Sequence, residues 1–339
     1  MKKKDLLRRL LSKKRALSSG NDRKSNGRDI ESKKHKKGRK ELLKEIKVEY
    51  GHSFSSLFSP CSRQKSREGV KISFKVCLSN KKWDEVEYRF RCPEKLDTFD
   101  MKVFLAILSS IQNESPLEVV NPLEKSPLEE KKQNKMDPKN QKLIDVLLVK
   151  GENAKMKESF IYSKKGLSVY SILKKITKDR SKKSIEAFNR SIKRLSTVEV
   201  FVYCKKNGKV AKKIASTLLG FVTDESTNKI YITLNPVISK AILGTPLTGY
   251  VPKIDERVFS LRGIASILLL RLCSWLGKGK KGKVSISVLE KWIYGENTAD
   301  SIKRSKRKRK IKRALLKIGS LKGWQIIERN GEVYLIFRI

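Results

Sequence analysis

The sequence predicts an α+β fold in which two successive units share one order of elements: helix, helix, basic helix, strand, turn, strand. The first observation is the spacing of the apolar residues. It changes from a helical period to strand-like alternation twice, first in the segment that ends at residue 223 and again in the segment that ends at residue 338. The second is that each strand pair directly follows a helix rich in Lys and Arg. The third is size, because 339 residues with 38% hydrophobic side chains can fill two modest cores and leave a tail.

The tail is expected at the N-terminus. Residues 1–46 carry 18 Lys or Arg residues and 6 Asp or Glu residues, with almost no aromatic side chains to nucleate a core. We therefore expect a disordered basic tail. Such a tail either holds DNA phosphates without sequence preference or only solubilises the chain, and charge alone does not decide between the two.

Ordered structure is expected from Val70 onward. The segments VKISFKV and DEVEYRF alternate like two strands joined by a turn at 79–82, and residues 98–111 have helical spacing. Residues 113–142 break the pattern, because Pro-Leu-Glu recurs there three times and repeated prolines block a helix. We interpret this segment as a low-complexity insertion, to which we assign no function.

The first unit begins with a short helix at 167–176 and a turn at 179–181, which leads into an amphipathic helix with Ser181 at its N-cap. The inward face of that helix is formed by Ile185, Phe188, Ile192 and Leu195. The outward side and leading end carry polar and basic residues, which suit phosphates and base edges: Ser181, Lys182, Lys183, Asn189, Arg190, Lys193 and Arg194.

A hairpin follows this helix. We expect strands at 198–204 and 215–223 around a basic turn at 205–209 that contains Lys205 and Lys206. A helix-turn-helix followed by such a wing is the winged-helix arrangement. A single amphipathic helix with a charged outer face is usually only a surface helix. The basic hairpin directly after it, and the repetition of the same order later, favour DNA binding.

The second unit begins with a strongly apolar helix at 259–276, in which Leu272 and Trp275 are packing residues. A short element at 284–289 extends to Trp292, and residues 297–300 offer caps for a helix from Ser301. Strands at 324–328 and 333–338 then form a second wing across a turn at 329–331.

The helix from Ser301 is the most informative element, because nine of the eleven residues from Lys303 to Arg313 are Lys or Arg. Its C-terminal half is anchored by an apolar face at Ile311, Leu315 and Ile318. The same face continues toward the N-terminus as Arg304, Arg307 and Lys308, so we expect the N-terminal half to project from the core. A projecting basic helix fits the DNA major groove, whereas the alternative is a generic polyanion-binding or localisation-like run. Lys306, Arg309 and Arg313 lie opposite the anchoring face. The predicted DNA contacts of this unit are Lys303, Arg304, Lys306, Arg307, Lys308, Arg309, Lys310, Arg313 and, in the wing, Arg329.

Net charge indicates the class of partner. With 79 Lys or Arg residues against 35 Asp or Glu residues, the chain carries +44, which a polyanion such as nucleic acid would neutralise. We expect no membrane partner, because the most apolar stretch, 264–272, is short and contains Arg271. Five scattered cysteines without a CxxC spacing, and a basic start without a secretory apolar region, favour the cytoplasm.

Two enzymatic patterns are incomplete. Residues 277–283 fit GxxxxGK, but Val284 replaces the Ser or Thr that holds magnesium, and the segment follows a helix rather than a strand. We interpret it as a flexible basic loop. A nicking initiator needs clustered histidines for its metal, and the chain has only His35 and His52. We therefore expect no enzyme, catalytic residue, metal or cofactor.

A resemblance rests on residues of the second half. These are RLCSWL at 271–276, Gly-Lys-Val at 282–284 leading into SISVL, the basic helix, and Gly323-Trp324. Together they resemble the RepC family of IncQ-type plasmid replication initiators. The segment YITLNP at 231–236, before a helix at 237–243, is similar to the joint between that family's two halves. The resemblance is clear over 160–339, weaker over 70–112, and absent in the tail and the insertion.

The resemblance implies a bacterial, plasmid-associated protein with two tandem winged-helix domains that bind directly repeated origin sequences, or iterons. It further implies melting of an adjacent AT-rich region and recruitment of the replicative helicase and primase of the plasmid or the host. The recognition helices would be 181–195 and 301–318. We predict a tail at 1–46, a first domain at 47–235 including the insertion, and a second at 236–339. The resemblance leaves the dimerisation surface of a homodimer open. The alternatives are a winged-helix transcriptional regulator or autorepressor and a general RNA- or chromatin-like binder.

Overall fold

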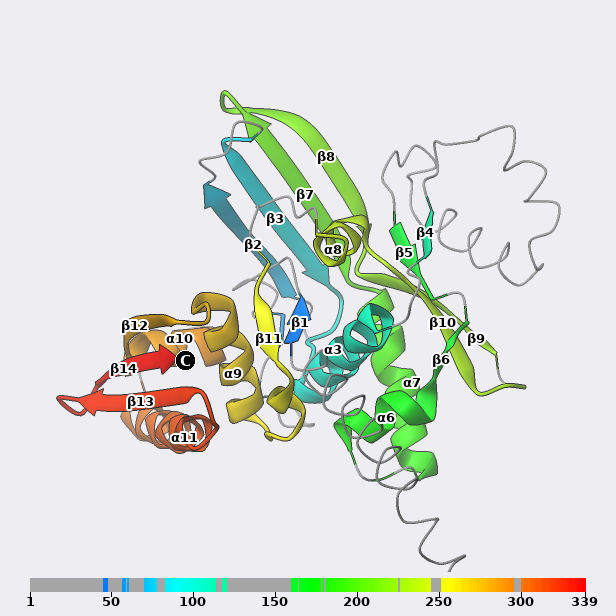
Figure 1. The fold of residues 1–339 in the computed structure, drawn as a ribbon. Helices are drawn as coiled ribbons and strands as arrows, with labels where there is room; N and C mark the ends of the chain where they lie inside the picture. Colours follow the sequence, from blue (N-terminus) through cyan, green and yellow to red (C-terminus); the bar gives the residue numbers. More distant parts are fainter. Residues whose placement is uncertain are drawn as a thin grey trace, which may run out of the picture. The chain divides into compact units, whose positions relative to one another are not determined.

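A computed structural model describes residues 45–47, 57–58, 60, 70–77, 83–113, 118–120, 160–163, 165–177, 179, 181–224, 226–244, 251–295 and 300–339 (Figure 1). The predictions for the tail before residue 45, the turn at 79–82, most of the insertion, and His35 and His52 lie outside these residues. Residues 45–339 form one compact unit. The predicted domain boundaries stay predictions.

The first part of this unit combines helices with two antiparallel sheets. Its strands are β2 (Val70–Cys77), β3 (Glu85–Cys92), β4 (Glu118–Val120), β5 (Phe160–Tyr162), β6 (Leu167–Ser168), β7 (Glu199–Lys206), β8 (Lys209–Thr217), β9 (Leu219–Asp224) and β10 (Lys229–Leu234). Its helices are α3 (Thr98–Gln112), α6 (Val169–Ile176), α7 (Lys182–Ser196) and α8 (Pro236–Ile242).

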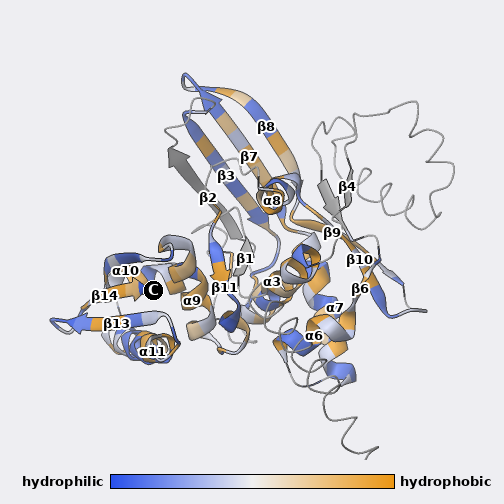
Figure 2. Cartoon of the chain, in the orientation of Figure 1, coloured by the Kyte–Doolittle hydropathy of each residue, from blue (hydrophilic) through white to orange (hydrophobic). Residues whose placement is uncertain are grey.

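The four-stranded sheet has the order β2-β3-β7-β8. Hydrophobic and hydrophilic residues alternate along β3, as Figure 2 shows, and Tyr88, Phe90 and Val202 of the inner face are buried. The β7–β8 hairpin turns on Asn207 and Gly208, whose φ angles of 51° and 73° match the positive values that a tight hairpin turn requires. The pairing of β2 with β3 and the helix α3 confirm the predictions for 70–111.

The second sheet has the order β4-β5-β10-β6, with β9 also paired to β10. Its junction with the first sheet is Leu218, a fully buried residue between β8 and β9 whose amide donates to the Val198 carbonyl at 2.8 Å. The predicted return strand at 215–223 is therefore wrong as a single strand. Two strands of different sheets meet there, and β8 already starts at Lys209.

The second part of the unit follows a short connection. Its elements are β11 (Lys253–Asp255), a 3-10 helix η1 (Glu256–Phe259), α9 (Ile264–Trp275), β12 (Lys280–Ser285), α10 (Ile286–Tyr294), α11 (Ser301–Gly319), β13 (Trp324–Arg329) and β14 (Val333–Arg338). The three-stranded sheet has the order β12-β14-β13. An early strand, β1 (Glu45–Lys47), pairs antiparallel with β11, so the predicted tail ends inside a strand.

Several element boundaries differ from the predictions. The first short helix begins at Val169, because Leu167 and Ser168 pair with β10. The apolar helix begins at Ile264, after Gly263 with φ 55°, and not at residue 259. Most of the basic segment 277–284 is not a loop, since β12 pairs with β14 from Lys280 onward and only residues 277–279 precede the strand. Part of the proline-containing insertion forms β4, which pairs with β5.

Packing explains why residue 282 is glycine. A Cβ there would meet the ring of Trp275 at Cη2, at Cζ2 (2.7 Å) and at Cζ3 (2.9 Å). Trp275 itself meets Trp292 edge to face, with ring centroids 5.5 Å apart. The Gly-Lys-Val segment therefore serves close packing of β12 on α9, which confirms Trp275 as a packing residue.

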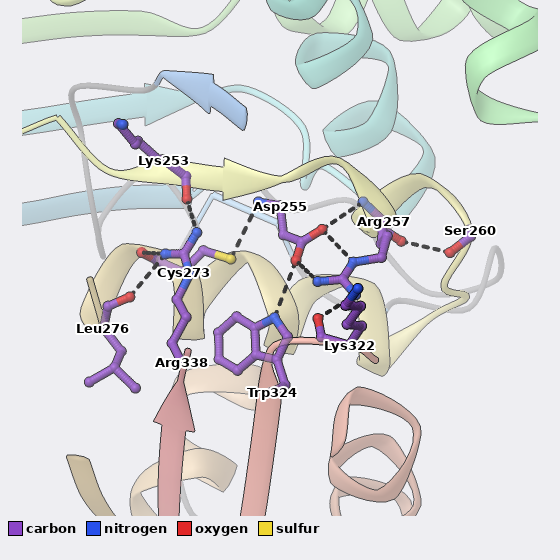
Figure 3. A network of polar contacts seen from close by, with 9 residues as sticks. All are labelled: Lys253, Asp255, Arg257, Ser260, Cys273, Leu276, Lys322, Trp324 and Arg338. Carbon is purple, nitrogen blue, oxygen red and sulfur yellow. Dashed lines mark hydrogen bonds and ion pairs between the residues drawn. The ribbon is translucent and has the colours of Figure 1, made fainter. Parts of the chain in front are cut away.

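A buried polar network joins the last strand to α9 and β11 (Figure 3). Arg338 donates to the carbonyls of Cys273 (3.1 Å) and Leu276 (2.9 Å) and lies against the Trp324 ring. The Trp324 indole donates to Asp255 at 3.2 Å, and the Asp255 carboxylate also binds Arg257. The network thereby holds the start of β13 and the end of β14 against α9 and β11.

Among the described residues, no helix has the length and apolar character needed to cross a membrane. The described part of the chain also holds no group of three or more His, Cys, Asp or Glu side chains placed to bind a metal ion. Cys92, Cys204 and Cys273 are buried and form no disulfide within the described residues.

Candidate nucleic-acid interface

The helix α7 carries the first set of predicted contacts. Its inward face is as predicted, because Phe188, Ile192 and Leu195 are buried and Ile185 packs against the core. Six of the seven predicted residues on its other side are exposed: Ser181, Lys182, Lys183, Asn189, Arg190 and Lys193. The helix therefore presents four cations to solvent.

Asp179 organises the start of α7. Its carboxylate accepts hydrogen bonds from the Ser181 amide (2.9 Å), the Ser181 hydroxyl (2.9 Å) and the Ser184 hydroxyl (2.8 Å). These bonds hold the pKa of Asp179 below its usual value, and the bond from the Ser181 amide has the largest effect. Ser181 occupies the N-cap position as predicted, but its hydroxyl is bonded to Asp179.

Arg194 does not lie on the outward face, and that prediction is wrong. Its guanidinium binds Asp100 of α3 at 2.5 and 3.2 Å, and its side chain is 12% exposed. Asp100 is 1% exposed in its side chain, and this burial raises its pKa although Arg194 acts in the opposite direction. The prediction failed because the periodicity of α7 alone does not show that α3 packs on the side where Arg194 lies.

The two predicted lysines of the first wing lie in different surroundings. Lys205 lies within β7 rather than in the turn, and its ammonium binds Glu85 (2.8 Å) and Glu87 (3.1 Å) of β3. Lys206 is exposed beside the Asn207–Gly208 turn, and Lys209 and Lys213 of β8 are also exposed. The exposed cations of this wing therefore come mostly from β8.

The helix α11 carries the second set of predicted contacts. Asp300 caps it by accepting a hydrogen bond from the Lys303 amide at 3.0 Å, and Ile311, Leu315 and Ile318 are buried as predicted. The exposed predicted residues are Lys303, Arg304, Lys306, Arg309, Lys310 and Arg313, and Arg329 is exposed at the end of β13. Figure 2 shows the tip of the β13–β14 hairpin in hydrophilic colours.

The N-terminal half of α11 lies outside the apolar core, as predicted, but a buried carboxylate holds one side of it. Glu290 of α10 is fully buried, with Oε1 3.5 Å from Arg307 Nη1 and Oε2 3.9 Å from Arg304 Nε. Arg307 also lies 4.3 Å from the centre of the Tyr294 ring, and its side chain is 17% exposed. The inward face of α11 is therefore apolar in its C-terminal half and is continued by ion-paired arginines in its N-terminal half.

The wing supplies two further anions to the same helix. Lys308 binds Glu332, which lies just before β14, and this contact holds the pKa of Glu332 below its usual value. Lys312 binds Glu328 of β13 at 2.6 Å. Lys308 therefore faces the hairpin, while Lys306, Arg309 and Arg313 remain on the opposite, exposed side.

Sequence reasoning missed Glu290, and a signal for it exists. Ile286, Leu289 and Ile293 of α10 are buried at helical spacing, and Glu290 falls on that same face. A lone acid among apolar positions, next to a helix dense in cations, indicates a buried ion pair. The Asp100–Arg194 pair had no comparable signal, because its partners lie 94 residues apart.

Fold and site together define a class: a basic α+β protein in which a cation-bearing helix is followed by a β-hairpin twice along the chain. The chain belongs to the Replication protein C (RepC) family, whose sequence model matches residues 90–338, and so to a family of replication initiators.

Two crystal structures of domains 2 and 3 of RctB are also similar to this chain. One, a selenomethionine derivative, has 10% identity and a TM-score of 0.40, and the match covers 81% of this chain and 92% of that chain. The other has 11% identity and a TM-score of 0.44, with 85% and 97% covered. A comparison with curated proteins finds no match.

Proposed function

We propose that the protein initiates plasmid replication by binding directly repeated origin sequences as double-stranded DNA. The observation that carries the proposal is the exposed face of α11, where Lys306, Arg309 and Arg313 lie opposite the buried Ile311. Membership of a replication initiator family supports the same role. Arginine and lysine on one helix face are the side chains that most often contact guanine edges and phosphates in the major groove.

The second unit has the arrangement of a winged helix in this proposal. Its order of α9, β12, α10, α11, β13 and β14, with the sheet order β12-β14-β13, supports this assignment, in which α10 and α11 would form the helix-turn-helix and β13 and β14 the wing. α11 would enter the major groove, and Arg329 at the tip of the wing would contact a flanking phosphate.

The first unit would dock in the same way through α7 and the β7–β8 hairpin. Lys183 and Arg190 of α7 are exposed, and Lys206 and Lys209 of the hairpin would bind phosphates. Two recognition helices on one chain would read two successive major grooves, which lie about 10 base pairs apart. One molecule would then occupy a repeat of about 20 base pairs, roughly two helical turns.

Binding would act mechanically in this account. The protein would bend or melt the duplex without covalent chemistry, metal or cofactor, and a plasmid or host helicase and primase would load on the opened strands. We further propose that it acts in the bacterial cytoplasm and pairs into a homodimer.

A nuclease footprint on the DNA that flanks the gene tests the proposal. Binding to iterons predicts several protected segments in the same orientation at one regular spacing. A single protected palindrome would instead identify a transcriptional regulator or autorepressor. Uniform weak protection of the whole fragment would contradict both functions and indicate a general polyanion binder.

A further inference from the structure

An isoleucine lies within the cationic face of α11. Ile302 is 66% exposed, although it is a large apolar side chain in the first turn of the helix. Lys306, Arg309 and Arg313 follow it at intervals of four, seven and eleven residues, so all four side chains lie along one stripe. The centre of this stripe lies opposite Ile311, which is fully buried.

The surroundings of Ile302 indicate a polar target with an apolar group. Its neighbours Ser301, Lys303 and Lys306 are all exposed, so it belongs to no apolar patch of its helix. In the major groove the base edges present donors, acceptors and a single apolar group, the 5-methyl of thymine. The N-terminal residues of a recognition helix are those that reach base edges.

We propose that Ile302 contacts the 5-methyl group of a thymine and thereby contributes to the choice of DNA sequence. The inference rests on the proposed function, because it needs α11 in the major groove. Arg309, two turns further along the stripe, would hydrogen-bond a base further along the groove, and Ile302 would select for thymine at its own position. Burying one methyl-sized group is worth about 0.8 kcal/mol, which corresponds to about a fourfold change in affinity.

The chain offers a matched control. Leu316 is 75% exposed on the same side of α11, but it lies fourteen residues after Ile302, about 21 Å along the helix axis. Replacing either side chain with alanine removes similar exposed apolar surface. Only Ile302 lies in the part of the helix that would meet the bases.

The experiment compares thymine with uracil, which lacks the 5-methyl group. The DNA flanking the gene is amplified once with thymidine triphosphate and once with deoxyuridine triphosphate. Dissociation constants for the wild type, Ile302→Ala and Leu316→Ala are then measured by fluorescence anisotropy at one salt concentration. We expect the preference for thymine DNA over uracil DNA to fall about fourfold in Ile302→Ala and to remain at the wild-type value in Leu316→Ala.

Three results would count against the inference in distinguishable ways. An Ile302→Ala protein that loses affinity for both fragments equally would show that the side chain does not read the methyl group, and would leave the proposed function intact. An equal change of preference in Leu316→Ala would show that the methyl effect does not arise at the N-terminus of α11. Equal binding of the wild type to these fragments and to a scrambled duplex would overturn the proposed function and this inference with it.

Discussion

Glu290 is the residue on which the orientation of α11 depends. It is fully buried, it lies between Arg304 and Arg307, and neither carboxylate oxygen accepts a hydrogen bond within the described part of the chain. A buried charge of this kind is held by its ion pairs, and it keeps two of the nine Lys and Arg residues between 303 and 313 on the protein side of the helix. The remaining exposed cations therefore face outward as a defined set.

Replacing Glu290 with glutamine should lower the free energy of unfolding by about 1–3 kcal/mol, because it removes the buried anion that lies between Arg304 and Arg307. Urea denaturation measures the change. Glu332→Gln is the control, since it removes the same charge from an exposed pair with Lys308 and should cost less than about 1 kcal/mol. Equal effects of the two substitutions would show that Glu290 does not hold the helix.

Arg194 and Arg190 make a second residue-scale contrast on α7. Arg194→Met would leave the buried Asp100 without its cation and should cost about 3–5 kcal/mol of unfolding free energy. Arg190→Met, at an exposed position, should change stability by less than about 0.5 kcal/mol. Under the proposed function, Arg190→Met should relax the choice of DNA sequence. Stability is measured by urea denaturation and DNA choice by anisotropy, and an unstable Arg190→Met protein would contradict this division of roles.

Helical spacing predicted the exposure of α7 and α11 correctly at most positions, and it failed where a second element approaches. Phe188, Ile192, Ile311 and Leu315 were placed inward from the sequence because apolar periodicity records burial directly. Arg194 was misplaced because a charged residue can be buried when another segment supplies its counterion. Arg307 was placed on the correct side of its helix, but its buried counterion Glu290 was not foreseen. The periodicity of one helix does not reveal a counterion that another segment supplies.

At the scale of elements, the order of helices and strands was predictable and some boundaries were not. The hairpin of β13 and β14 was placed correctly from its alternation and from its Asn-Gly turn, where Asn330 and Gly331 have φ angles of 50° and 69°. Most of the glycine-rich segment 277–284 was misread as a loop. Gly282 permits close packing against Trp275, and Lys280, Lys281 and Lys283 lie in an edge strand of the sheet.

Lys102 joins α3 to the end of η1 and to the segment that follows it. Its ammonium donates to the carbonyls of Phe259 (2.7 Å) and Leu261 (2.6 Å), and burial lowers its pKa from 10.5 to about 8, with Arg262 acting in the same direction. Between these two pH values the unfolded chain holds the proton and the folded chain releases it. The contribution of Lys102 to stability therefore rises with pH in that range.

The corresponding test compares the wild type with Lys102→Met. The difference in unfolding free energy should move in favour of the wild type from about pH 8 to about pH 10, by at most about 1.4 kcal/mol per pH unit. Urea denaturation at a series of pH values measures it. A difference that stays constant or falls over this range would show that Lys102 is not desolvated in the folded protein.

At the scale of the whole molecule, the net charge of +44 should contribute to affinity for any DNA, and only those cations that contact bases should contribute to the choice of sequence. Cations that touch only phosphates should act on every duplex alike, because phosphates carry no sequence information. Replacing Lys2, Lys3 and Lys4 of the N-terminal tail with glutamine should weaken binding to all DNA equally. It should lower the slope of log affinity against log salt by about one for each phosphate that the tail no longer neutralises.

Arg309→Ala provides the contrast in the same salt titration. It should relax the choice of sequence, because Arg309 lies in the middle of the exposed stripe of α11 and is expected to contact a base. If Arg309→Ala left sequence preference unchanged, the assignment of α11 to the major groove would be wrong.

The most direct test of the central claim is fluorescence-anisotropy binding, at fixed salt, to DNA from upstream and downstream of the gene and to a scrambled duplex of equal length. A fragment that contains tandem repeats should be preferred by about a thousandfold or more, as is usual for sequence-specific proteins. Equal affinity for every duplex would contradict the account and leave a basic protein that binds nucleic acid without selecting an origin.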